Sequence, residues 1–148
     1  MLSKKYIHIL LIEDNMGDFL LTQEALKECN VDYVLHHFQE GTEALKYLNK
    51  QVPYQDAVMP DFVLLDLNMP KMSGLEVLQI IKNTPHLKKI PVIVLSTSYS
   101  DSDVETAYDL HANAYIPKPL DYDDFVHIIK VIEQFWGHVV KLPTHILP

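Results

Sequence analysis

The sequence predicts an α/β protein in which a parallel β-sheet is covered by helices on both faces. Short apolar runs alternate along the chain with segments of helical periodicity, the pattern of repeated strand–helix units. The apolar runs are nearly continuous stretches of Val, Ile and Leu rather than strict alternations of apolar and polar residues. Continuous runs of this kind are typical of strands that are buried on both faces, as in parallel sheets.

Five strands and five helices are expected in alternation. The expected strands are Ile7–Ile12, Tyr33–Phe38, Phe62–Asp66, Val92–Leu95 and Ala114–Ile116, and the expected helices are Met16–Glu28, Thr42–Asn49, Gly74–Lys82, Asp103–Leu110 and Tyr122–Trp136. Helix start signals support several of these: Asn15 and Asp121 as N-caps, and Ser73 with Glu76 and Ser102 with Glu105 as capping boxes. Residues 51–61, which include two prolines, are expected to form a surface loop.

Length and composition favour one small intracellular domain. The 148 residues suit a single domain over residues 1–148, with a core at about 5–136 and a C-terminal tail over 137–148 that lacks helical periodicity. A net charge of −8 would repel a phosphate backbone, so no direct nucleic-acid partner is expected. The single cysteine, Cys29, suits a reducing cytoplasm. No apolar run approaches the ~20 residues of a membrane span, so no membrane association is expected.

Polar side chains follow four of the expected strands. Glu13 and Asp14 follow the first strand. Asp66, Ser96 and Lys118 stand at or just past the ends of the third, fourth and fifth strands. Ligands bind at the carboxyl ends of the strands in open parallel sheets, so these groups are expected to meet in one pocket. Three carboxylates at close range raise one another's pKa unless a proton or a cation intervenes. A hard divalent cation is therefore expected. The eight histidines show no ligand spacing, so no histidine metal site is expected.

The ordered set of acids, hydroxyl and amine, together with Asp66-Leu-Asn-Met-Pro and Lys118-Pro119, resembles the receiver domain of two-component response regulators, the CheY-like family. The match covers roughly residues 5–136. The resemblance, and not the residue pattern, implies that the five-stranded sheet has the order 2-1-3-4-5. It also implies a cis peptide bond between Lys118 and Pro119.

The resemblance assigns a role to each residue of the set. Asp66 would be the phosphoacceptor, Glu13 and Asp14 would hold Mg²⁺ or Mn²⁺ with Asp66, and Asn68 would add a backbone carbonyl ligand. Ser96 would bond the phosphoryl group, Lys118 would neutralise it, and Tyr115 would act with Ser96 as the switch. The chemistry is consistent, because an Asp carboxylate can form an aspartyl phosphate. Phosphoryl transfer mainly needs alignment and charge neutralisation.

Other classes of protein are weighed against this interpretation. A haloacid-dehalogenase-like phosphatase would need a second Asp where Asn68 stands, and a flavodoxin-like carrier would need a phosphate-binding loop where Glu13-Asp14-Asn15 stands. A degenerate receiver, acting as a phosphorylation-independent interaction module, would lack the acceptor or the acids, and all of them are present.

The expected protein is a stand-alone response regulator rather than an enzyme. It would catalyse only its own phosphorylation and dephosphorylation. Its last helix and the Leu142-Pro143 tail resemble the small regulators of phytochrome-type histidine kinases, so a sensor kinase of that type is the expected phosphodonor. The short segment after Trp136 leaves no room for a DNA-binding output domain, so output is expected to pass through contacts with a downstream protein. A homodimer built on Phe135 and Trp136 is also expected.

Overall fold

The computed structural model describes residues 6–29 and 32–143. The elements, in chain order, are β1 (Ile7–Ile12), α1 (Met16–Lys27), β2 (Tyr33–Phe38), α2 (Gly41–Leu48), β3 (Phe62–Leu65), α3 (Gly74–Asn83), β4 (Val92–Ser96), α4 (Asp101–Asp109), β5 (Ala114–Pro117) and α5 (Tyr122–Gln134), followed by the π-helix η1 (Phe135–Val139). Every expected strand and helix is present, and every bound lies within two residues of the expected one.

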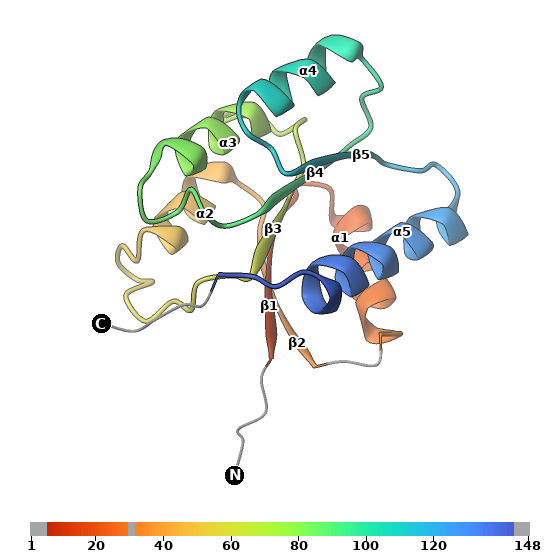
Figure 1. Cartoon of the computed structure of the whole chain (residues 1–148), viewed down its shortest axis with the longest axis horizontal. Coiled ribbons are helices and arrows are strands. Elements are labelled where there is room, and N and C mark those ends of the chain that lie inside the picture. Colours follow the sequence, from red (N-terminus) through yellow and green to blue (C-terminus); the bar gives the residue numbers. More distant parts are fainter. Residues whose placement is uncertain (1–5, 30–31, 144–148) are drawn as a thin grey trace.

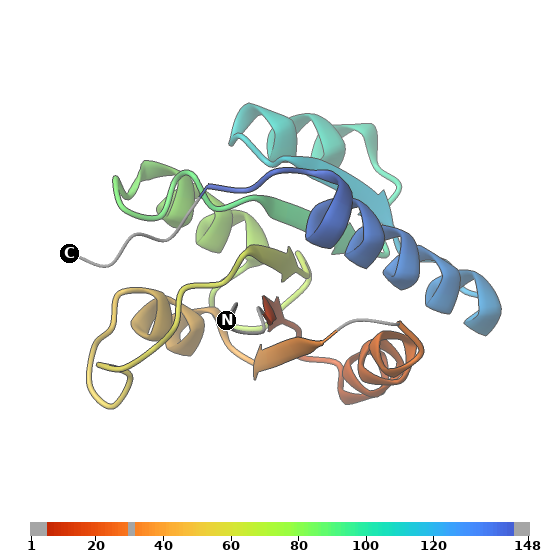
Figure 2. The same cartoon turned by 60° about the horizontal axis from the view of Figure 1, so that its bottom comes forward.

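The strands form one sheet in the order β2-β1-β3-β4-β5, and each neighbouring pair is parallel. Helices α1 and α5 cover one face, and α2, α3 and α4 cover the other (Figure 1). Figure 2 shows the same layers after a turn about the horizontal axis. The predicted fold class is thus confirmed, including the strand order.

Alternate residues of the central strands supply two separate cores. In β3, Val63 and Leu65 face the cluster under α2, α3 and α4, whereas Phe62 and Leu64 face the cluster under α1 and α5. All four side chains are at most 1% exposed. A strand with apolar residues at every position is stable only in such a two-sided layer, which explains the continuous apolar runs in the sequence.

The N-terminal capping of α4 differs from the prediction. The Ser100 hydroxyl accepts from the Asp103 main-chain N–H at 3.3 Å, so α4 begins at Asp101, and the expected cap at Ser102 is wrong. The serine-rich stretch offers several possible caps, and the loop geometry after β4 selects the earlier one. The caps Asn15, Ser73 and Asp121 are confirmed.

The end of α5 also differs from the prediction. The chain does not leave the helical path at Gly137, because η1 continues it to Val139, with Val140 N–H donating to the Phe135 carbonyl oxygen at 2.9 Å. Two contacts favour this wide turn: Trp136 packs against the core under α1 and α5, and His138 Nε2 lies 2.6 Å from Glu133 Oε1. Residues 144–148 of the expected tail lie outside the described part of the chain.

No helix in the described residues is both long enough and apolar enough to cross a membrane.

Candidate functional site

The register of the central strands places the predicted acids side by side. Ile12 of β1 pairs with Leu65 of β3, so the next residues, Glu13 and Asp66, leave neighbouring strands at the same level. The Asp66 main-chain N–H donates to the Ile12 carbonyl oxygen at 3.0 Å, which extends the pairing to the acceptor position. Parallel strands with this alignment necessarily bring their carboxyl ends to one edge.

Glu13, Asp14 and Asp66 each present a carboxylate oxygen, and these atoms lie within 4.8 Å of one another. Glu13 and Asp66 are buried and Asp14 is half-buried. Clustered carboxylate oxygens are ligands that suit Mg²⁺ and Mn²⁺. The donor set therefore fits the divalent metal that the sequence predicts, and the three acids would hold it.

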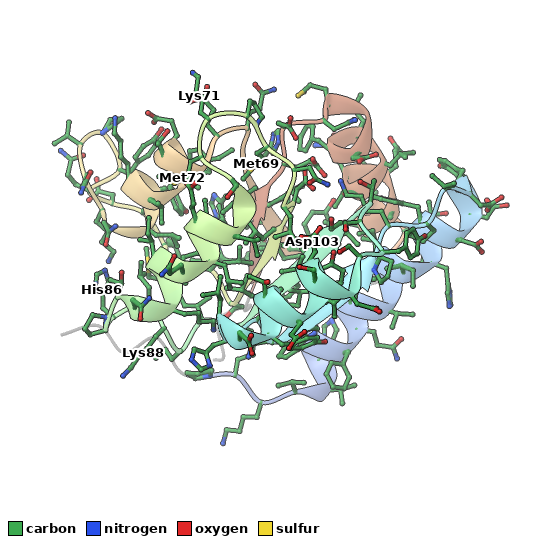
Figure 3. The ribbon with its side chains drawn as sticks, turned by 90° about the horizontal axis from the view of Figure 1, so that it is seen from above. Met69, Lys71, Met72, His86, Lys88 and Asp103 are labelled. Atoms are coloured by element: carbon green, nitrogen blue, oxygen red, sulfur yellow. The ribbon has the colours of Figure 1, made fainter. Side chains whose placement is uncertain are left out.

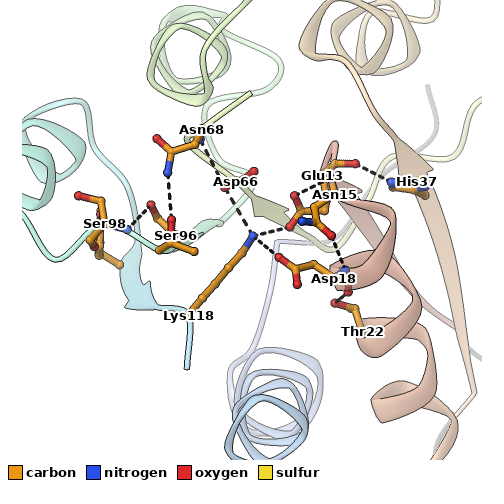
Figure 4. Close-up of polar contacts among 12 residues, drawn as sticks. Glu13, Asn15, Asp18, Thr22, His37, Asp66, Asn68, Ser96, Ser98 and Lys118 are labelled. Atoms are coloured by element: carbon orange, nitrogen blue, oxygen red, sulfur yellow. Dashed lines mark hydrogen bonds and ion pairs between the residues drawn. The ribbon is translucent and has the colours of Figure 1, made fainter. Parts of the chain in front are cut away.

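Lys118 follows β5 directly and lines the same pocket. Its main-chain N–H donates to the Ser96 carbonyl oxygen at 2.6 Å, and its side chain is 5% exposed. Its Nζ atom lies 2.6 Å from Glu13 Oε1, 2.8 Å from Asp18 Oδ2 and 3.6 Å from Asp66 Oδ1 (Figure 4).

The peptide bond between Lys118 and Pro119 is trans, so the expected cis bond is wrong; the cis bond in the described chain joins Val52 and Pro53. The amine reaches the acids with the trans bond, and trans is the isomer that X-Pro bonds favour by about 0.5–1 kcal/mol.

Burial and the neighbouring charges shift the pKa values of the ionisable groups in the site. Burial is the main reason why the pKa of Glu13 is raised to about 8; Lys118 lowers this pKa and the nearby Asp66 carboxylate raises it, and the value is the net result. Burial and Asp66 also raise the pKa of Asp14. Burial alone would lower the pKa of Lys118, but its hydrogen bonds to Asp18 and Glu13 outweigh burial and raise it. The two acids hold protons mainly because they are buried, and Lys118 holds its proton because carboxylates surround it; a bound cation would relieve the repulsion among these carboxylates.

The pocket opens to solvent at the carboxyl edge of the sheet and has a volume of about 490 Å³. Its lining residues are Asp14, Asn15, Met16, Asp18, Asp66, Asn68, Thr97 and Lys118. Asn68 Nδ2 donates to Thr97 Oγ1 at 3.3 Å, so these two exposed side chains join the loops after β3 and β4 across the entrance. Viewed from above, the β3–α3 loop carries Met69 and, further out, Lys71, which pairs with Glu40 at 3.1 Å (Figure 3).

The two predicted switch residues occupy different environments. Ser96 is fully buried at the end of β4, and its Oγ accepts from the Ser98 N–H at 3.1 Å, so it does not line the pocket. Tyr115 is half-buried in β5, and its hydroxyl donates to the Ser98 carbonyl oxygen at 3.0 Å. Both residues therefore hold the loop after β4. The same loop is tied to α4, because Ser98 Oγ donates to Asp103 Oδ2 at 2.6 Å.

The structure adds three residues that the sequence analysis missed. Asp18 binds Lys118; His37 Nε2 lies 2.8 Å from the Glu13 carbonyl oxygen; and Gly74 lies against the Asp66 main chain. The position of Asp18 in the first turn of the helix that follows Glu13 and Asp14 could have indicated it, because that turn begins at the same edge of the sheet. No local sequence signal indicates the other two, because each contact is made between different elements of the fold.

Fold and site together define a class of protein: a doubly wound α/β domain with a cation-binding acidic pocket beside a buried lysine. A sequence profile of the response regulator receiver domain matches residues 9–130. The chain belongs to this family. Its function is therefore phosphorylation-dependent two-component signalling, and it has the divalent-metal pocket of a receiver domain.

Two curated relatives are similar over most of their length. Response regulator Rcp1 of Synechocystis sp. is 43% identical over 136 residues, which is 92% of this chain and 92% of Rcp1. The probable methanogenesis regulatory protein FilR2 of Methanothrix harundinacea is 38% identical over 86% of this chain and 82% of FilR2.

Solved structures show the same fold. The phosphorylated cyanobacterial phytochrome response regulator RcpA matches with a TM-score of 0.92 and 44% identity, over 95% of this chain and all of RcpA. The Mn²⁺-bound form of Rcp1 matches with a TM-score of 0.89 and 42% identity, over 96% of this chain and all of that chain.

Proposed function

We propose that Asp66 is the residue of this receiver that accepts the phosphoryl group. The observation that carries the proposal is the position of its buried carboxylate, which lines the pocket beside Glu13 and Asp14 and lies 3.6 Å from the Lys118 Nζ atom. Glu13, Asp14 and the Asn68 carbonyl are proposed as the metal ligands beside Asp66. Ser96 and Tyr115 are proposed as the switch that responds through the loop after β4.

The proposed reaction is a single phosphoryl transfer. A carboxylate oxygen of Asp66 attacks the phosphorus atom, the bond from phosphorus to the donor nitrogen or oxygen breaks, and its electron pair leaves with the donor. Water reverses the modification by attacking the same phosphorus, which releases inorganic phosphate and restores the carboxylate. Lys118 provides a fixed positive charge to the phosphoryl oxygens, and a bound divalent cation supplies the remaining charge neutralisation. In this sense the chain would catalyse its own phosphorylation and dephosphorylation.

We further propose a phytochrome-type histidine kinase as the donor. The support is the similarity to RcpA, a cyanobacterial phytochrome response regulator, and to the bacteriophytochrome response regulator RtBRR, which matches at 36% identity and a TM-score of 0.73. Each chain would contribute a single receiver domain and would act in the cytoplasm on a downstream protein. With a net charge of −8 it would not bind nucleic acid directly.

We also propose that the chain forms a homodimer through the exposed side of α5. Val131, Phe135 and Val139 recur every four residues along α5 and η1 and are 47%, 47% and 66% exposed. This spacing aligns them on one helical face, which an isologous contact would cover. Trp136, expected to be in the interface, packs instead against its own core, so Phe135 is the better candidate anchor.

Intact-mass measurement after incubation with acetyl phosphate and Mg²⁺ tests the assignment of Asp66. The wild-type chain should gain one phosphoryl group, and both Asp66→Asn and excess chelator should abolish the gain. Asp61→Asn is a matched control, because Asp61 is also buried but leads into β3 at the opposite end of the strand. Undiminished labelling of Asp66→Asn would contradict the assignment.

A further inference from the structure

We propose that Asp18 is a positioning residue that holds Lys118 away from Asp66 in the resting receiver and so sets how readily the site accepts a phosphoryl group. The inference rests on the proposed roles of Asp66 and Lys118, and it adds a residue outside the predicted constellation.

The geometry places Lys118 with partners other than the acceptor. Its Nζ atom lies within hydrogen-bond distance of Glu13 Oε1, at 2.6 Å, and of Asp18 Oδ2, at 2.8 Å. Its distance to Asp66 Oδ1 is 3.6 Å, too long for a hydrogen bond. Figure 4 shows the amine lying between Asp66 on one side and Glu13 and Asp18 on the other.

Asp18 is held in place by its own helix. Its main-chain N–H donates to the side chain of the N-cap residue Asn15 at 2.9 Å, and its carbonyl oxygen accepts from Thr22 Oγ1 at 2.8 Å. The Asp18 side chain is 25% exposed and lines the pocket. Moving Asp18 would disturb the first turn of α1. These bonds fix the main chain of Asp18, so we expect the long Lys118 side chain to be the partner that moves when the site changes state.

Asp18 is distinct from the metal-binding acids. The carboxylate cluster of Glu13, Asp14 and Asp66 does not include it, so a bound cation leaves Asp18 as a partner of Lys118. A phosphoryl group on Asp66 needs the same amine, so Lys118 must loosen its contact with Asp18 to neutralise it. Any interaction made only in the resting state shifts the equilibrium towards that state. The Asp18 carboxylate thus disfavours the phosphorylated form.

Binding of beryllofluoride, a mimic of the phosphoryl group, tests the proposal with the full chain. Titration calorimetry at saturating Mg²⁺ should show that Asp18→Asn binds the mimic roughly three- to tenfold more tightly than wild type, the range expected for losing one partly exposed charged hydrogen bond. Asp18→Glu, which keeps the charge, should bind more like wild type. Asp124→Asn removes one negative charge from the exposed first turn of α5 and should leave the affinity unchanged.

A second measurement separates contact with Lys118 from a general charge effect. Labelling rates with excess acetyl phosphate should rise in Asp18→Asn, but the same substitution should have no effect in a Lys118→Met background. Unchanged or weaker beryllofluoride binding by Asp18→Asn, or an equal gain in rate without Lys118, would overturn the role of Asp18. Failure of the wild-type chain to bind beryllofluoride, or binding retained in Asp66→Asn, would instead overturn the assignment of Asp66.

Discussion

The Nε2 atom of His37 in β2 lies 2.8 Å from the main-chain carbonyl oxygen of Glu13. A carbonyl oxygen can only accept, so Nε2 carries the proton and donates. The imidazole also stacks on Phe19 of α1, with ring centroids 4.0 Å apart and an interplanar angle of 7°. His37 therefore fixes the main chain between the two acids that follow β1.

Replacing His37 should weaken metal binding without removing a ligand. His37→Phe keeps an aromatic ring against Phe19 but loses the donor, and should weaken Mg²⁺ binding about tenfold, the lower end of the range for residues that orient metal ligands. His37→Gln retains a side-chain N–H that can reach the carbonyl and should restore most of the affinity. Titration calorimetry would measure both. Equal affinity for His37→Phe and wild type would show that the hydrogen bond does not orient the acids.

Gly74 should be needed for the position of Asp66. A Cβ atom at Gly74 would collide with the Asp66 carbonyl oxygen and with Leu67 Cα, because the start of α3 lies directly on the chain after β3. Gly74→Ala should cost roughly 1–3 kcal/mol of unfolding free energy through overpacking, and it should slow Asp66 labelling. Urea denaturation and intact mass would measure the two effects. Gln79→Ala, at an exposed position of the same helix, should change neither.

Thr97 should restrict access to the phosphoryl site. It lines the pocket and accepts a hydrogen bond from Asn68 Nδ2 at 3.3 Å. Thr97→Ala should open the entrance and raise the rates of labelling and of phosphate loss by about two- to fivefold, equivalent to one weak hydrogen bond. Thr97→Ser keeps the hydroxyl, so its two rates should lie between those of the wild type and of Thr97→Ala. The rates follow from intact mass against time, and unchanged rates in the alanine variant would show that Thr97 does not limit access.

Stability and metal binding should depend on pH in opposite directions. The pKa of Glu13 is raised from 4.5 to about 8 by burial, so its contribution to the stability of the metal-free protein is present below pH 4.5 and is lost as the pH rises through 8. A cation competes with this proton, so Mg²⁺ should raise the melting temperature more at pH 8 than at pH 6. Thermal melts at both pH values would measure the difference. Glu13→Gln should largely remove this difference between the two pH values. If Mg²⁺ raised the melting temperature of the wild type equally at pH 6 and pH 8, the prediction would be contradicted.

Association should depend on Phe135 more than on Trp136. If the exposed face of α5 and η1 forms the dimer, Phe135→Ala should weaken dimerisation by more than about 1 kcal/mol and leave Asp66 labelling intact. Trp136→Ala should instead lower the unfolding free energy, because the indole packs on its own core. Sedimentation with and without phosphodonor would measure association. A wild-type monomer at all concentrations would exclude the dimer.

The sequence by itself determined the layers of the fold and the contents of the site. Continuous apolar strands such as Phe62–Leu65 can be stable only between two helical layers, and parallel strands must end at one edge, so Glu13, Asp66 and Lys118 could be assigned to one pocket before any coordinates. The strand order came from the resemblance. Helix starts at Asn15, Ser73 and Asp121 were also predictable, since an N-cap is a local interaction.

Tertiary structure alone decided what depends on contacts between distant segments. The distance of Lys118 from Asp18 and Asp66, the hydrogen bond of His37 to Glu13 and the approach of Gly74 to Asp66 each join residues on different elements. The π-helical end of α5 follows in part from the packing of Trp136 on its own core, which no local pattern in the sequence indicates. Short-range patterns fix which groups are available, whereas side-chain geometry within a shared pocket depends on how all the elements pack together.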